Sequence, residues 1–304
     1  MSVTILFVAD VCGRPGRQAC AHMIKPLRQK HNVDYVIANV ENAAGGFGVT
    51  PEMSRKMFSY GIDMQTSGNH IWDRVEVIEY MNNEDPRLLR PANFPPGVPG
   101  RGSYLHEMED VQFGTVNLMG RTYMKDIDCP FQIGDKVVEV LLRQTPVIIV
   151  DFHAEATSEK QALFYHLDGK VSAIIGSHTH VQTVDSQISS RGTAYITDAG
   201  MTGPHRSVIG MQIGPSLGRF VTGMPKRFTT ATDDVKLSGV IVEVDEKSGR
   251  ALRIEPFRLD FDLETFNPED ITGPRPTTEE VEGDVEEVAA GQEQTEPKDK
   301  EPES

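Results

Sequence analysis

The sequence predicts a layered α/β fold. Short apolar runs alternate with helical segments along the chain, and its later part is rich in strand-like runs, a pattern typical of helices packed on sheets. The 304 residues, 38% hydrophobic and 25% charged, suit one large globular domain or two small ones. Because no linker interrupts the first 270 residues, we expect one domain over residues 1–272 and a tail over residues 273–304.

The first half of the chain alternates predicted strands and helices. Residues 3–9, apolar except for Thr4, predict a buried strand. In the helix predicted over residues 15–30, Ala19, Met23 and Leu27 share one face. The other elements expected here are strands at residues 33–39, 62–66 and 113–119 and a helix with Thr50 as N-cap and Pro51 in its first turn.

The second half repeats this pattern. A helix is predicted over residues 133–143, and Ser158 and Gln161 have the spacing of a capping box at the start of another helix. Residues 91–102, rich in proline and glycine, predict a surface loop. Strands are expected at residues 147–152, 171–176, 194–197 and 237–244.

The tail has a composition unlike the rest of the chain. Residues 273–304 contain eleven acids and three bases, a formal −8 of the chain's −15, and no aromatic residue. Such a segment cannot bury enough apolar surface to offset the entropy of ordering it. We therefore expect a disordered acidic tail, a solvated spacer in preference to a partner-binding segment.

Cysteine content and charge indicate the cellular setting. Three cysteines cannot build a disulfide framework, and with no basic leader or cleavage pattern they predict a cytoplasmic protein. No apolar run approaches the ~20 residues that a membrane span requires. The body has no stripe of lysine and arginine, so binding to long nucleic acid is not expected. The oligomeric state stays open, including a homo-oligomer.

Polar side chains follow five of the predicted strands, at the points where the strands end. In open α/β sheets, ligands bind beyond the carboxyl ends of strands, so these side chains are expected to share one site. Each motif alone is weak, because an aspartate after a strand is commonly a cap and a His-x-His pair is as often structural. The residues, in strand order, are Asp10, then Glu41 and Asn42, then Asn69 and His70, then His153, then His178 and His180.

The chemical types of these residues predict a metal centre. Carboxylate, amide and imidazole groups without thiolate suit divalent manganese, iron or zinc. Two ions ~3.5–4 Å apart can clamp a phosphate ester and turn a bound water into the nucleophile. The sequence therefore predicts two divalent ions per subunit.

The order of these motifs resembles the calcineurin-like metallophosphoesterase superfamily. There, an Asp, an acidic bridging ligand, Gly-Asn-His, a His and Gly-His-x-His follow successive strands. The sequence is more closely similar to a bacterial YmdB-type branch of 2′,3′-cyclic-nucleotide phosphodiesterases, and the likeness covers about residues 1–260. It is carried by residues 41–46, 151–160, 178–181 and 197–204.

The resemblance implies a four-layer αββα sandwich and a role for each site residue. His70 is expected to donate a proton to the leaving alkoxide. The branch is linked to 2′,3′-cyclic nucleotides and aryl phosphates, with iron or manganese as the metal and zinc as the alternative. Implied ligands are Asp10, His180 and Asn42 for one ion, Asn69, His153 and His178 for the other, and Glu41 as the bridge.

Some positions keep two interpretations. Where the superfamily has Asp-x-His, this chain has Cys12 in place of the histidine, and a core role for that cysteine is favoured over metal binding. Arg121 could bind substrate phosphate or form a surface ion pair. For His205 an exposed loop position is favoured over one that lines the pocket, and for Glu155 and Glu159 a role in capping and solvating a helix is favoured over one as bases.

The sequence thus predicts an enzyme that hydrolyses a small phosphodiester such as 2′,3′-cAMP. A non-catalytic, metal-containing nucleotide-binding or regulatory protein stays open, because one ligand of the superfamily is missing and the tail is unusual. An RNA nuclease is disfavoured by the lack of a basic groove.

Overall fold

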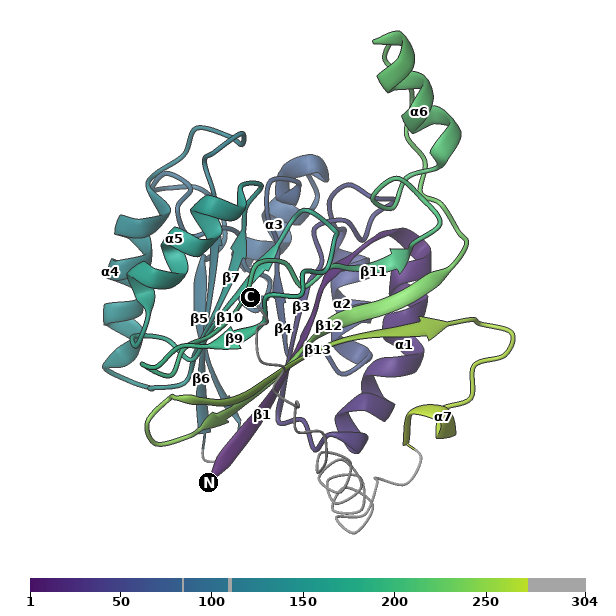
Figure 1. Ribbon diagram of the computed structural model, residues 1–304. Helices are drawn as coiled ribbons and strands as arrows, with labels where there is room; N and C mark the ends of the chain where they lie inside the picture. Colours follow the sequence, from purple (N-terminus) through teal and green to yellow (C-terminus); the bar gives the residue numbers. More distant parts are fainter. Residues whose placement is uncertain (84, 109–110, 273–304) are drawn as a thin grey trace, which may run out of the picture. The chain divides into compact units, whose positions relative to one another are not determined.

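The computed structural model describes residues 1–83, 85–108 and 111–272. Among these residues the strands form two sheets that face each other, and helices cover the outer side of each sheet (Figure 1). The predicted four-layer αββα sandwich is confirmed. The strands and the longer helices belong to one compact unit, Met1–Ile271. The tail predicted at residues 273–304 lies outside the described residues.

The first sheet has seven strands among the described residues. Their order is β2-β11-β12-β1-β3-β4, with β13 paired to β12. The strand β1 is parallel to β3, which is parallel to β4, whereas β12 runs antiparallel to β1. The bounds are β1 (Ser2–Val8), β2 (Asp10–Val11), β3 (Tyr35–Asn39), β4 (Met64–Thr66), β11 (Met201–Pro204), β12 (Val235–Asp245) and β13 (Ala251–Phe261).

The second sheet has six strands in the described part of the chain, in the order β5-β6-β7-β8-β10-β9. The four inner strands are parallel, and the two edge strands are antiparallel to their neighbours. The bounds are β5 (Ser103–Met108), β6 (Val111–Met119), β7 (Ile148–His153), β8 (Ala173–Ser177), β9 (Gln187–Ile188) and β10 (Ala194–Ile196).

The helices form the two outer layers. Apolar side chains of α1, α2 and α3 pack against the first sheet, and those of α4 and α5 against the second. Helix α6 extends away from the sheets (Figure 1). The bounds are α1 (Gly13–Lys30), α2 (Pro51–Ser59), the 3-10 helix η1 (Ile71–Asp73), α3 (Val77–Asn83), α4 (Pro130–Leu142), α5 (Thr157–Leu167), α6 (Ile213–Thr222) and α7 (Glu269–Thr272).

The second half of strand β1 shows why its sequence is apolar at successive positions. Leu6 and Val8 point into the core beneath the outer helices, whereas Ile5 and Phe7 point into the core between the two sheets. Side chains alternate along a strand, so a strand covered on both faces has a continuous apolar run.

Of the two helix starts predicted from capping residues, one is confirmed. The Thr50 hydroxyl accepts a hydrogen bond from the Met53 N–H at 3.3 Å, as an N-cap should. The capping box predicted at Ser158 and Gln161 is wrong. Helix α5 begins at Thr157 with Ala156 as its N-cap and no side-chain cap, which places Ser158 inside the first turn.

The loop predicted at residues 91–102 has no helix or strand, but it is not confined to the surface. Asn93 is fully buried, donates to the Met119 carbonyl at 2.7 Å and accepts from the Met119 N–H at 2.9 Å. One polar side chain thereby satisfies both backbone groups of Met119. A composition rich in proline and glycine does not predict such a bond.

In the described part of the chain, no helix is both long and apolar enough to cross a membrane.

Candidate metal centre

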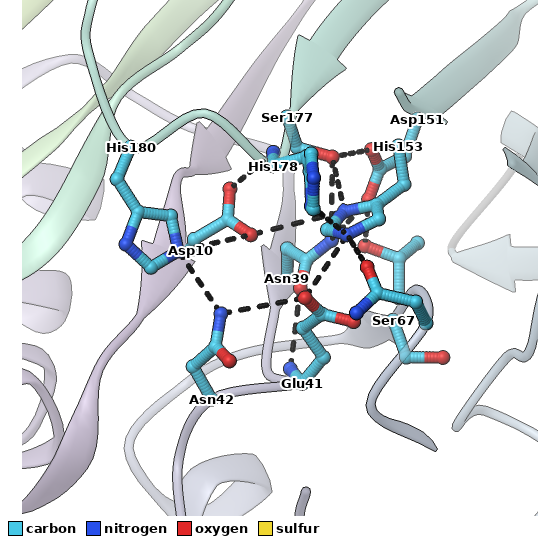
Figure 2. Close-up of polar contacts among 12 residues, drawn as sticks. Asp10, Asn39, Glu41, Asn42, Ser67, Asp151, His153, Ser177, His178 and His180 are labelled. Carbon is cyan, nitrogen blue, oxygen red and sulfur yellow. Dashed lines mark hydrogen bonds and ion pairs between the residues drawn. The ribbon is translucent and has the colours of Figure 1, made fainter. Parts of the chain in front are cut away.

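The candidate site lies where parallel strands of both sheets end. Carboxylate and imidazole groups from the two sheets turn toward one another there (Figure 2). Asp10 follows β1, Glu41 and Asn42 follow β3, Asn69 and His70 follow β4, His153 is the last residue of β7, and His178 and His180 follow β8.

His153 is the centre of a first group of ligand-type atoms. Its Nε2 atom lies 2.9 Å from Glu41 Oε1, 3.0 Å from Asn69 Oδ1 and 3.0 Å from His178 Nδ1. The ligand atoms of Glu41, His153 and His178 all lie within 4.8 Å of one another. Atoms this close can share one cation at contact distances of about 2.0–2.3 Å.

Asp10, Asn42 and His180 form a second group. His180 Nε2 lies 3.0 Å from the Asn42 amide nitrogen and 3.9 Å from Asp10 Oδ1. The amide of Asn42 also lies 3.4 Å from Glu41 Oε1, so Glu41 contacts both groups. A half-turn of the Asn42 amide presents its oxygen in place of its nitrogen.

Each imidazole directs one nitrogen to the centre and bonds the other elsewhere, as metal-binding histidines usually do. This arrangement fixes the orientation of each ring. The outer bonds are His153 Nδ1 to Ser177 Oγ at 3.0 Å, His180 Nδ1 to the Ile209 carbonyl at 2.9 Å, and His178 Nε2 to Glu155 Oε2 at 3.0 Å.

Burial and mutual contact shift the pKa values of these groups. Burial raises the pKa of Asp10 well above its usual value. It also acts to raise the pKa of Glu41, but the contact with His153 outweighs burial and lowers it to about 2. Burial and the neighbouring His153 lower the pKa of His178 to about 3, and burial lowers that of His180. Burial also acts to lower the pKa of His153, but the contact with Glu41 outweighs burial and raises it to about 9. Neutral imidazoles are the form that binds metals, so His178 and His180 are ready to bind, whereas a cation would have to displace a proton from His153.

The centre fits a divalent cation. Among the described residues, the buried Asp10 Oδ1 has no hydrogen-bond partner, which is costly for a carboxylate oxygen. A cation would satisfy it. The donor set of carboxylate, amide and imidazole suits manganese, iron or zinc.

His70 stands beside this centre. Its backbone N–H donates to Glu41 Oε2 at 3.0 Å, and its ring Nδ1 lies 2.7 Å from Asp73 Oδ2. The ring also packs edge-on against Phe47, with 5.1 Å between centroids. Because Asp73 occupies Nδ1, the Nε2 atom of His70 is left to exchange a proton with a ligand.

A pocket of about 340 Å³ opens onto the centre. One wall carries polar groups, among them Glu41, His70 and His180. The rest of the lining is largely apolar, and Arg219 stands over Phe228 at 5.2 Å from the ring centroid. This apolar wall consists of Phe47, Val208, Ile209, Met211, Phe220 and Phe228, and Phe47 packs directly against His70.

Three residues with open interpretations lie off this pocket. Arg121 is exposed and is not among the residues that line it. Cys12 packs in an apolar cluster with Met201 and Met211, and burial raises the pKa of its thiol to about 12, which supports a core role. His205 is half-buried and its Nε2 lies 3.1 Å from the Met201 carbonyl oxygen.

Glu159 caps a loop, not its own helix. Its carboxylate accepts from the backbone N–H groups of Arg121 and Thr122 at 3.0 Å each. The expected role as a helix cap is therefore replaced by a bond to the segment that follows β6.

Sequence reasoning missed two acidic residues that support the site, Asp73 and Asp151. The expected helix-capping role of Glu155 is wrong, because the N-cap of α5 is Ala156 and Glu155 contacts His178 instead. Asp151 Oδ1 accepts at 2.6 Å from the Ser177 hydroxyl, which contacts His153. Asp151 is two residues before His153 on β7, so strand alternation predicts that both face the same side. For Glu155, which lies outside the strand, no periodic pattern exists.

The αββα fold and this centre define the class of protein: the chain is a phosphoric-ester hydrolase of the metallophosphoesterase type. A model of the YmdB-like protein family matches residues 6–257. The chain belongs to this family.

Known proteins resemble the chain over most of its length. It is 42% identical over 258 residues to a 2′,3′-cyclic-nucleotide 2′-phosphodiesterase of Bacillus subtilis, covering 85% of this chain and 97% of that protein. A crystal structure of a hypothetical protein from Thermus thermophilus matches with a TM-score of 0.79 and 38% identity, covering 85% of this chain and 99% of that one. A phosphatase structure from Mycoplasma pneumoniae matches with a TM-score of 0.80 and 32% identity, covering 89% and 99%.

Proposed function

We propose that this phosphoesterase hydrolyses phosphodiesters, foremost 2′,3′-cyclic nucleotides such as 2′,3′-cAMP, at a site that holds two divalent ions. The observation that carries the proposal is the convergence of ligand-type atoms from both sheets, with His153 Nε2 within 3.0 Å of Glu41, Asn69 and His178. The name of the Bacillus subtilis relative supports the choice of substrate.

The two groups of side chains correspond to two ions. Iron or manganese is proposed, with zinc as the alternative, because the donors are oxygen and imidazole nitrogen. Asp10, Asn42 and His180 would hold one ion and Asn69, His153 and His178 the other, and Glu41, which contacts both groups, would bridge them.

When bound, the ions would supply Lewis acidity, lowering the pKa of a water and polarising the phosphoryl oxygens. A water adds to phosphorus and loses a proton to solvent, and the bond from phosphorus to one ribose oxygen breaks. That oxygen takes a proton from His70 Nε2, which solvent then restores. Asp73 Oδ2, at 2.7 Å from Nδ1, holds the His70 ring so that Nε2 faces the ligand. The low exposure of Glu41 and His153 keeps bulk water from their side chains.

The test of this proposal is metal depletion and restoration. Chelator-treated protein should be inert toward 2′,3′-cAMP, and added Mn²⁺ or Fe²⁺ should restore turnover, with elemental analysis reporting the metal bound. Nucleotide binding without turnover at full metal occupancy would overturn it in favour of the non-catalytic, regulatory alternative.

The apolar wall of the pocket supports a nucleotide over a smaller ester. Stacking of a base on an aromatic ring is worth ~1–3 kcal/mol, so Phe228→Ala should raise KM for 2′,3′-cAMP by about 5- to 150-fold. The KM for ribose 2′,3′-cyclic phosphate, which has no base, should change little. Tyr165→Ala, at an exposed aromatic residue of α5, is the matched control. Equal effects on both substrates would contradict a base subsite at Phe228.

A cytoplasmic location, the absence of long nucleic-acid partners and the role of residues 273–304 stay predictions of the sequence, and the oligomeric state stays open.

A further inference from the structure

The turn from His178 to His180 has a backbone conformation that needs support from other segments. The φ angle is 97° at His178 and 65° at His180. Residues other than glycine rarely adopt positive φ, because the Cβ atom then crowds the backbone. Two such residues flanking Thr179 persist only when their surroundings hold them.

Asp198, which follows β10, holds the middle of this turn. Its Oδ2 atom accepts from the Thr179 N–H at 3.0 Å and from the Thr179 hydroxyl at 2.8 Å. Its Oδ1 atom accepts from the Gly200 N–H at 2.9 Å, which fixes the carboxylate. The residue between the two histidines is thus bound through both its backbone and its side chain.

Lys160, in the first turn of α5, holds Asp198 and the start of the turn together. Its ammonium group donates to Asp198 Oδ2 and to the Ser177 carbonyl, each at 2.8 Å. Gly176 lets β8 and the residue after β10 approach closely beside the lysine, since a Cβ atom there would lie 1.7 Å from the Thr197 carbonyl oxygen and 3.2 Å from Lys160 Cδ. One side chain therefore ties α5 to the ends of β8 and β10.

Stability alone does not account for this pair. Both side chains are 0% exposed. Moving two charges out of water is so costly that apolar replacements of buried ion pairs are often neutral or stabilising. Neither residue is among those that line the pocket. The pair instead binds the backbone on either side of His178: Lys160 binds the Ser177 carbonyl, and Asp198 binds the Thr179 N–H.

We propose that Lys160 and Asp198 are positioning residues that hold the His178–Thr179–His180 turn in its left-handed conformation, so that both imidazoles face the metal centre. This inference rests on the proposed function, because it takes His178 and His180 as metal ligands. The pair acts through the backbone of the turn and does not touch the reacting atoms.

The test is a charge-neutral double variant, Lys160→Met with Asp198→Asn, which removes both charges without stranding either. Loss of residues that orient metal ligands typically costs about 10–100-fold in metal affinity, and this loss is expected for Mn²⁺ measured by titration calorimetry. Turnover of 2′,3′-cAMP at low Mn²⁺ should fall, and excess Mn²⁺ should recover part of it. A merely structural defect would not respond to Mn²⁺.

The matched control is Lys170→Met with Asp135→Asn, a surface pair with 2.7 Å between Lys170 Nζ and Asp135 Oδ1. Its Mn²⁺ affinity should equal that of the unmodified chain. A folded Lys160/Asp198 variant that binds Mn²⁺ as tightly as the unmodified chain would overturn this inference alone. Absence of Mn²⁺ binding by the unmodified chain would overturn the proposed function as well.

If the double variant does not fold, Thr179→Val decides the question. This change removes only the hydroxyl that donates to Asp198 and keeps the shape of the side chain. Weaker Mn²⁺ binding with an unchanged melting temperature supports the inference, and unchanged binding overturns it.

Discussion

At the scale of single residues, His70 differs from its neighbours in what it contacts. Its ring bonds Asp73, whereas the rings of His153, His178 and His180 each turn a nitrogen toward another ligand-type atom. With 28% of its side chain exposed, His70 can also reach a ligand in the pocket. These contacts suit a proton donor better than a metal ligand.

His70→Ala should therefore keep its metal ions and lose most of its activity. General-acid catalysis is typically worth about 10²–10⁴-fold, and a fall of this size is expected in kcat for 2′,3′-cAMP. Elemental analysis should find the same metal content as in the unmodified protein. Asp73→Asn should give a smaller loss of kcat, because the His70 ring stays but loses the carboxylate that orients it. Loss of both metals from His70→Ala would contradict the assigned role.

At the scale of elements, helix α1 approaches the first sheet at a point where only glycine fits. A Cβ atom at Gly16 would lie 2.3 Å from the backbone oxygen of Thr202 in β11. By contrast, a Cβ atom at Gly218 in α6 would meet only Lys226 Cε, at 3.8 Å.

Gly16→Ala should lower the free energy of unfolding by about 1–3 kcal/mol, the usual cost of overpacking. Gly218→Ala is the matched control and should raise it by about 0.5–1 kcal/mol, because alanine loses less backbone entropy in a helix. Urea denaturation measures both. Equal changes in the free energy of unfolding for the two variants would mean that α1 can move away from β11 without loss of stability.

The elements that the sequence predicts best are those buried by both layers. The apolar run of β1 is readable because both its faces are covered. In contrast, β13, an edge strand with charged residues such as Arg253 and Asp260, was missed, although it pairs with β12 along its whole length. Its pairing depends on a hairpin partner and not on its own periodicity.

At the scale of the whole molecule, the metal centre joins two sheets whose residues are far apart in sequence. Asp10 Oδ2 lies 3.3 Å from the His178 N–H, across 168 positions of the chain. An unfolded chain cannot assemble such a site, so bound ions stabilise the folded state.

Removal of the metals should lower the melting temperature. Ions at 100 times their dissociation constant contribute about 2.7 kcal/mol, which for a chain of this size corresponds to a shift of roughly 5–10 °C. Calorimetry with and without chelator measures this shift. Glu41→Gln, which alters the proposed bridge, should show a much smaller shift, and a chelator that leaves the unmodified protein's melting temperature unchanged would argue against a metal centre.

The sequence by itself determined the α/β class, most of the inner strands of both sheets and the polar residues at their ends, because burial periodicity and strand termini are local properties. Only the tertiary structure decided which residues support the site. Asp73, Glu155, Lys160 and Asp198 act through partners on other segments, or through a turn whose shape local sequence does not specify. Contacts between distant segments depend on how two sheets pack, and no local pattern encodes that packing.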